Sequence, residues 1–149
     1  MKLAFVLFKY FPYGGLQRDM VRMANACQEL GYEIHVYTLS WQGDVPAGFH
    51  VHLLPARGLR NFVRYRDFIR LLQQTLARHP VTAVVGFNRI SGLDVYYAAD
   101  PCFRQEHVEN RPWYVRFLGR YRFFLQQEEA VFGRAANTLV LMISSLQLQ

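Results

Sequence analysis

An abrupt change of hydrophobic pattern near the start of the chain constrains the fold most strongly. The six consecutive apolar residues Leu3–Phe8 are typical of a strand that is buried on both faces. Within the segment 9–19 and beyond it, apolar residues recur with the spacing of one helical face, which predicts a helix. Gly31 is expected to end this helix. A strand, a Pro-Gly-Gly loop and a helix in this order predict the opening unit of a doubly wound α/β domain, whose ligands bind at the carboxyl ends of the strands.

The loop between this strand and this helix carries the first candidate site. Gly14 and Gly15 have no Cβ, so they can adopt positive φ and let a ligand approach the main chain closely. The N–H groups of the following helical turn favour an anion, and Arg18 is well placed beside a phosphate. The alternative is a tight turn whose glycines only allow the helix to pack on the strand, because the full G-x-G-x-x-G spacing is missing.

Further strands are predicted along the chain, and they alternate with helices. Most read as buried strands, whereas His50–Leu54 alternates polar and apolar residues and is predicted to lie near an edge. The others are Ile34–Leu39, Val81–Phe87, Asp94–Ala99 and Thr138–Ile143. This order predicts an α/β fold with a Rossmann-like, open and mostly parallel sheet. His50 and His52 share one face without an acidic or cysteine partner, which favours solvated histidines over a metal site.

A basic helix follows the predicted edge strand. The segment 57–70 contains five arginines and one acidic residue, Asp67. A helix is expected from Asn61, as its N-cap, to the region of His79. Arg60 and Arg64 lie at its start, where the helix dipole prefers negative charge, and this placement indicates a phosphate-bearing partner. A basic face that is merely solvated is the alternative.

The segment 112–125 is apolar around most of a helix circumference. Six of its fourteen residues are aromatic, and its only charges are Arg116, Arg120 and Arg122. Aromatic and arginine side chains together suit the headgroup region of an anionic membrane. Single-stranded nucleic acid would use the same residue types, and burial between two domains is the third alternative.

Composition restricts the setting of the protein. A chain of 149 residues predicts one domain, and a net charge of +6 favours anionic partners. The first apolar stretch is too short for a signal peptide, and Cys27 and Cys102 form no disulfide or metal pattern, so a reducing compartment is expected. The chain ends six residues after its last predicted strand, so we expect the domain to be truncated.

Three motifs in order resemble a known enzyme family. These are Lys9–Asp19, Gly86-Phe-Asn88 and Gly92-Leu-Asp-Val95, and the aromatic segment follows them. The chain resembles the amino-terminal half of the bacterial lipopolysaccharide core glucosyltransferase I family, which are retaining GT-B enzymes of glycosyltransferase family four. The resemblance covers essentially all of residues 1–149 and implies an acceptor-binding, Rossmann-like amino-terminal domain, with the carboxyl-terminal donor domain absent.

The resemblance and the residue patterns above together assign roles to individual residues. Gly14 and Gly15, with Arg18, are expected to approach the donor diphosphate. Asp19 and Asp100 are the candidate catalytic residues, as contacts to sugar hydroxyls. The residues expected to bind the acceptor are Asn88, Arg89, Arg60 and Arg64. The expected membrane-binding residues are Trp113, Tyr114, Arg116, Phe117, Arg120, Tyr121, Arg122 and Phe124.

The implied reaction is transfer of glucose from UDP-glucose to the inner-core heptose of lipopolysaccharide with retention, by the intact protein and not by this chain alone. In front-side attack the main task is to stabilise the departing diphosphate, so no metal and no cofactor are expected. The implied partners are a nucleotide sugar, a lipopolysaccharide precursor and an anionic inner-membrane surface, without nucleic acid. The implied location is cytoplasmic, peripheral on the inner face of the bacterial inner membrane.

Two other functions remain open at this point. The first is a non-catalytic domain that docks on the membrane and binds the acceptor. The second is a dinucleotide-binding oxidoreductase domain, which the incomplete glycine motif and the absence of an acidic residue at Ser40–Trp41 disfavour.

Overall fold

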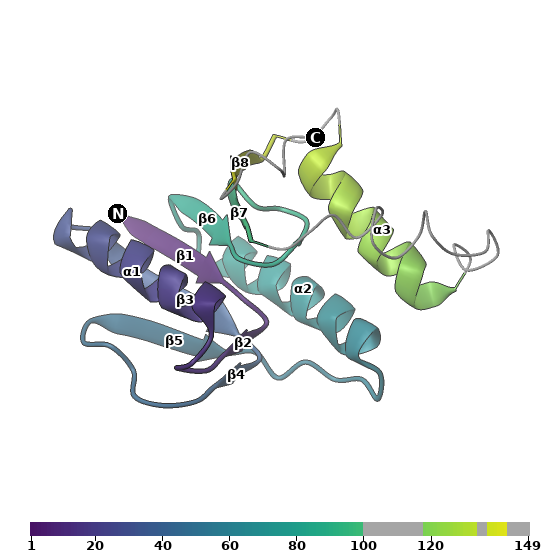
Figure 1. The fold of residues 1–149 in the computed structure, drawn as a ribbon, viewed down its shortest axis with the longest axis horizontal. Helices are drawn as coiled ribbons and strands as arrows, with labels where there is room; N and C mark the ends of the chain where they lie inside the picture. Colours follow the sequence, from purple (N-terminus) through teal and green to yellow (C-terminus); the bar gives the residue numbers. More distant parts are fainter. Residues whose placement is uncertain (100–117, 134–136, 143–149) are drawn as a thin grey trace.

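The computed structural model describes residues 1–99, 118–133 and 137–142, and within them a single parallel sheet organises the chain (Figure 1). Its six strands lie in the order β5-β3-β1-β6-β7-β8, and every neighbouring pair is parallel. The strands are β1 Lys2–Val6, β3 Glu33–Thr38, β5 Phe49–Leu53, β6 Ala83–Gly86, β7 Val95–Ala98 and β8 Leu139–Met142. The helices are α1 Gly15–Glu29, α2 Asn61–Arg78 and α3 Gly119–Phe132. The predicted α/β class with an open parallel sheet is confirmed.

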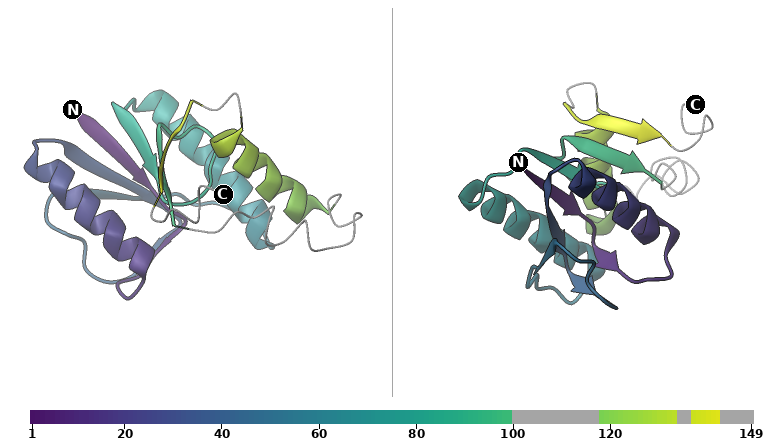
Figure 2. Two further views of the ribbon diagram at one scale, coloured as in Figure 1. Left: turned by 45° about the horizontal axis from the view of Figure 1, so that its top comes forward. Right: turned by 90° about the vertical axis from the view of Figure 1, so that its left-hand side faces the viewer.

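Both faces of the sheet are covered by helices. Phe5 and its neighbours pack under α1 with Met20 and Ala24. Val6 lies in the second cluster, which packs under α2 and α3 with Phe68. Figure 2 shows α1 and α2 on opposite sides of the sheet. Because successive side chains of a strand point to opposite faces, a strand covered on both sides must be apolar throughout, as the Leu3–Phe8 pattern predicted.

The predictions of where the first helix ends and which strand lies at an edge of the sheet are confirmed. Gly31, with φ of 92°, follows the end of α1 in the left-handed conformation that glycine adopts readily. β5 lies at one edge of the sheet, as the alternating pattern of His50–Leu54 predicted.

The predicted start of the basic helix is wrong by one residue. The N-cap of α2 is Arg60, whose side chain makes no cap hydrogen bond, and Asn61 is the first helical residue. Only the part of the aromatic segment 112–125 from residue 118 onward falls in the described ranges. There α3 begins at Gly119 and continues to Phe132. Among the described residues, no helix combines the length and the apolar character needed to cross a membrane.

Candidate functional site at the carboxyl edge of the sheet

The loops that follow β1 and β3 are joined in a small second sheet at the carboxyl edge of the main one. β2 (Lys9–Tyr10) pairs in parallel with β4 (Ser40–Trp41). The rings of Tyr10 and Trp41 stack with their centroids 3.7 Å apart. The Thr38 hydroxyl donates to the carbonyl of Phe8 at 3.1 Å. The glycine loop is therefore held on a fixed platform.

The two glycines of the loop have different roles. Neither adopts the positive φ that glycine allows, and Gly14 is the N-cap of α1 in an extended conformation. A Cβ on Gly14 would collide with the Gln17 side chain and would lie 2.6 Å from the Phe11 ring, whereas a Cβ on Gly15 would meet no atom within 4 Å. Gly14 is thus required by internal packing, and Gly15 leaves open space in front of the helix.

The amino end of α1 has the features of an anion site. No side chain caps it, and its first turn contains no acidic residue. The first N–H groups of a helix have no intrahelical acceptor, so here they remain available to a ligand at Gly15. Arg18 is exposed in the same turn. The role of Gly14, Gly15 and Arg18 at a donor diphosphate stays a prediction.

Gln17 fixes the shape of this loop and was not singled out from the sequence. Its side chain is buried, and its Nε2 donates to the carbonyl of Lys9 at 3.0 Å. A glutamine in the first turn of an amphipathic helix is the sequence signal that could have pointed to this residue. Its hydrogen-bond partner lies in the loop, and the sequence does not show how the loop folds back.

Asp19 lies one turn into α1 and points to the sheet. Its Oδ2 accepts a hydrogen bond of 2.9 Å from the hydroxyl of Tyr97 on β7. Burial, followed by the hydrogen bond to Asp19, raises the pKa of Tyr97 above its ordinary value. Asp19 therefore joins α1 to β7, and its second carboxylate oxygen is the group that the proposed contact to a sugar hydroxyl would use. Asp100, its predicted partner, lies outside the described residues.

Asn88 follows β6 at the same edge. Its Oδ1 accepts a hydrogen bond of 2.8 Å from the backbone N–H of Phe8. The loops after the two central strands are thereby fixed to each other.

Arg89, the next residue, points into the protein. Its Nη1 lies 3.4 Å from Oε2 of Glu128 on α3, and the two side chains are only 12% and 8% exposed. In the same loop the N–H of Ser91 donates to Oε1 of Gln127 at 2.8 Å. The structure thus uses Arg89 to attach α3 to the loop after β6. The partners Gln127 and Glu128 were missed because the sequence does not indicate which polar residues of α3 are buried.

A groove of about 510 Å³ lies between the amino ends of α2 and α3. Both ends face the carboxyl edge of the sheet, since each helix follows a parallel strand. The groove combines two sets of predicted residues, Arg60 from the acceptor set and Arg120 from the membrane set. Its other lining residues are Asn61, Phe62, Tyr65, Leu118, Gly119, Tyr121 and Phe124. Arg64 is half-buried on α2 and does not line the groove.

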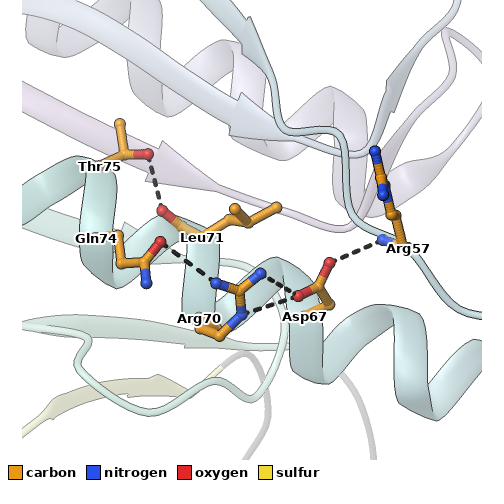
Figure 3. A network of polar contacts seen from close by, with 6 residues as sticks. All are labelled: Arg57, Asp67, Arg70, Leu71, Gln74 and Thr75. Carbon is orange, nitrogen blue, oxygen red and sulfur yellow. Dashed lines mark hydrogen bonds and ion pairs between the residues drawn. The ribbon is translucent and has the colours of Figure 1, made fainter.

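The exposed face of α2 is ordered by Asp67 (Figure 3). Its Oδ2 accepts a hydrogen bond of 2.8 Å from the N–H of Arg57, and its Oδ1 accepts two from the Arg70 guanidinium. The hydrogen bond from Arg57, together with Arg70, lowers the pKa of Asp67. The contact fixes the loop that leads to Arg60, and hence one wall of the groove.

Of the predicted membrane residues, three others besides Arg120 fall in the described part of the chain. Arg122 is exposed, whereas Tyr121 and Phe124 are partly buried. The Arg120 guanidinium lies over the Phe124 ring, 6.0 Å from its centroid. The remaining predicted residues, Trp113, Tyr114, Arg116 and Phe117, lie outside the described residues.

Comparisons with known proteins give a specific match. No protein-family model matches the chain. The chain is 38% identical over 148 residues to the lipopolysaccharide glucosyltransferase WaaG of Escherichia coli (strain K12), a match that spans 99% of this chain and 40% of that protein. A crystal structure of WaaG, a glycosyltransferase involved in lipopolysaccharide biosynthesis, superposes with a TM-score of 0.94 at 38% identity. That match covers 98% of this chain and 40% of the solved one.

The chain therefore spans about 40% of the length of the relative it matches. The resemblance predicted from the sequence is confirmed, because in both sequence and fold this chain matches the amino-terminal part of the glycosyltransferase WaaG.

Proposed function

We propose that this chain forms the acceptor-side domain of a glycosyltransferase of lipopolysaccharide biosynthesis. The observation that carries the proposal is the uncapped amino end of α1, with open space at Gly15, at the carboxyl edge of a parallel sheet. The similarity to WaaG over nearly the whole chain supports the same assignment. The donor is UDP-glucose, and the acceptor is the inner-core heptose of a lipopolysaccharide precursor.

The proposed mechanism assigns the diphosphate of the donor to the α1 terminus. Charge develops on this diphosphate as the glycosidic bond breaks, and N–H groups that already point at it stabilise that charge without reorganisation. Arg18 adds an exposed positive charge in the same turn. Glucose is transferred with retention by front-side attack, for which the donor phosphate accepts the proton of the acceptor hydroxyl. No protein nucleophile, metal or cofactor is required for this step.

The groove between α2 and α3 provides the acceptor path in this proposal. Arg60 and Arg120 line it and suit a phosphate-bearing sugar. Leu118 and Arg122 are exposed at the start of α3, where an apolar side chain and a guanidinium meet the headgroup region of an anionic bilayer. A lipid-linked acceptor would then enter from the cytoplasmic face of the inner membrane, with the protein bound peripherally.

A chimera tests the transferase assignment. This chain replaces the matching amino-terminal part of the E. coli relative, and transfer of radiolabelled glucose from UDP-glucose to glucose-deficient lipopolysaccharide is measured. We expect turnover in a chimera that melts cooperatively. Gly15→Val should abolish turnover by filling the space in front of the helix, and Arg18→Ala should lower it at least about tenfold. Arg22→Ala, an exposed arginine one turn further along α1, is the control and should have no effect.

Full turnover by the Gly15→Val chimera would remove the diphosphate role from this loop. A folded chimera that binds UDP-glucose but transfers nothing to any lipopolysaccharide core would contradict the acceptor assignment.

The second candidate function is a non-catalytic domain that docks on the membrane and binds the acceptor. The groove between α2 and α3 favours this function, because arginine and aromatic side chains line it together. Co-sedimentation of the chain with phosphatidylglycerol and phosphatidylcholine vesicles at low salt tests this function. We expect binding to the anionic vesicles only, and a loss of about fivefold for each of Arg120→Ala and Arg122→Ala, since one basic residue contributes about 1 kcal/mol. Arg78→Ala, at the far end of α2, is the matched control. Absence of binding to both vesicle types would reject the membrane role.

A further inference from the structure

One carboxylate and three imidazoles gather beside Tyr37 on the α2 face of the sheet, away from the glycine loop. In the parallel pairing of β3 with β5, His35 lies opposite His50, and Tyr37 lies opposite His52. Ile34 and Val36 point to the α1 face, so Glu33 and His35 share the other face with Tyr37. The group occupies the first half of β3, whereas the candidate site lies beyond the last residue of that strand.

Three potential ligand atoms converge in this group. The Nε2 of His35 lies 2.7 Å from Oε1 of Glu33, and the Nε2 of His50 lies 3.8 Å from the same oxygen. The ligand atoms of the three residues all lie within 4.8 Å of one another. The rings of His35 and His50 stack at 4.8 Å between their centroids. The prediction that His50 and His52 have no acidic partner is wrong for His50, because Glu33 on the neighbouring strand lies beside it.

The distances between these ligand atoms are close to the distances between ligand atoms around a coordinated metal ion. Zinc binds histidine nitrogen at about 2.0–2.1 Å in tetrahedral geometry, which separates two ligand atoms by about 3.3 Å. His35 is already fixed, with 13% of its side chain exposed, while His50 and Glu33 are 54% and 45% exposed. The two exposed side chains are therefore the ones that adjust around an ion, and such an adjustment requires no change of the backbone.

His52 orients His35 for this role. The Nδ1 of His35 lies 2.9 Å from the Nε2 of His52. When the Nδ1–H of His35 donates to His52, the lone pair of its Nε2 points toward Glu33 and His50. A ligating histidine almost always donates its second ring N–H in this way, which fixes both the tautomer and the ring orientation.

We propose that Glu33, His35 and His50 bind a divalent transition-metal ion, for which Zn²⁺ is the best fit. Two imidazoles and one carboxylate suit zinc and its neighbours in the first transition series, whereas Mg²⁺ and Ca²⁺ prefer oxygen ligands. The ion joins edge strand β5 to β3, and water completes its coordination. The site is structural, and its occupancy does not depend on the proposed transferase function.

The competing explanation is that charged and polar side chains simply keep an exposed edge strand from pairing with another chain. Titration of Zn²⁺ into the untagged, chelator-treated chain by isothermal calorimetry separates the two explanations. We expect one Zn²⁺ per chain with a Kd below about 10 µM, and a rise in melting temperature on binding. Co²⁺ substitution should give the visible absorption bands of a coordinated ion.

His50→Ala and Glu33→Gln change exposed side chains and should leave the fold intact, yet each should weaken Zn²⁺ binding at least about tenfold. His79→Ala removes an exposed histidine at the end of α2 and should bind Zn²⁺ as the wild type does. No saturable binding by the wild type, or wild-type affinity in His50→Ala, would overturn the proposal. A loss of binding in His79→Ala alone would equally overturn the assignment of these three ligands.

Discussion

The hydroxyl of Tyr97 donates a hydrogen bond of 2.9 Å to Oδ2 of Asp19, which joins strand β7 to helix α1 across 78 residues of sequence. The same carboxylate was expected to contact a sugar hydroxyl. Asp19 therefore has an internal partner that orients it, and the consequences of removing that partner are measurable.

Tyr97→Phe should lower the free energy of unfolding at pH 7 by about 1 kcal/mol, the usual net contribution of such a hydrogen bond. The folded-state pKa of Tyr97 is raised, by burial and then by Asp19, so its contribution is complete below the unfolded pKa of about 10 and is lost as pH rises through the folded value. Urea unfolding between pH 8 and 11 should thus show a steeper alkaline loss in the wild type than in Tyr97→Phe. Tyr13→Phe, at a tyrosine that is 81% exposed, is the control.

Asn88→Ala should destabilise the protein by about 1–3 kcal/mol, because the partly buried N–H of Phe8 loses its acceptor. Asn88→Asp retains an acceptor oxygen and should keep most of the stability. If the side-chain NH₂ also contacts the acceptor sugar, Asn88→Asp will lower turnover in the chimera while urea unfolding stays near the wild type. Equal stability of Asn88→Ala and of Asn137→Ala, an exposed asparagine, would contradict the structural role.

Alanine at the two loop glycines should have opposite effects on stability. Gly14→Ala forces Gln17 from its place, with loss of the hydrogen bond to Lys9, and should cost about 1–3 kcal/mol. Gly15→Ala lies at the first helical position with open space and should stabilise α1 by up to about 1 kcal/mol. Thermal unfolding of the two variants checks which of them is the more stable. A more stable Gly14→Ala would mean that Gln17 does not hold the loop.

Glu128→Ala should cost about 1.5–3 kcal/mol, because it removes a charged hydrogen bond to the Arg89 guanidinium in a largely buried position. Glu129→Ala, at the exposed neighbouring position, should change stability by less than about 0.5 kcal/mol. Chemical denaturation of both variants measures the difference. Similar values for the two would show that the pair does not hold α3 against the loop after β6.

The opening unit, the parallel sheet and the edge position of β5 could all be predicted from the sequence. These features follow from local patterns: a continuous apolar run for a strand covered on both faces, a helical period for α1, and alternation for a strand at the edge. Gly31 ends its helix for a reason that is equally local, since glycine readily adopts positive φ.

The site depended on contacts that no local pattern contains. Gly14 and Gly15 are adjacent and chemically identical, yet one faces Gln17 and the other faces open space, because the loop folds back on α1. Asp19 and Arg89 were predicted to contact sugar and acceptor, and the sequence did not indicate that Tyr97 and Glu128 reach them from distant elements.

The histidines give the clearest division between sequence and structure. The sequence by itself placed His50 and His52 on one face of a strand, since side chains alternate along it. Only the tertiary structure decided that His35 and Glu33 lie beside them, because the register of two parallel strands is set by the packing of the intervening chain and not by either strand alone.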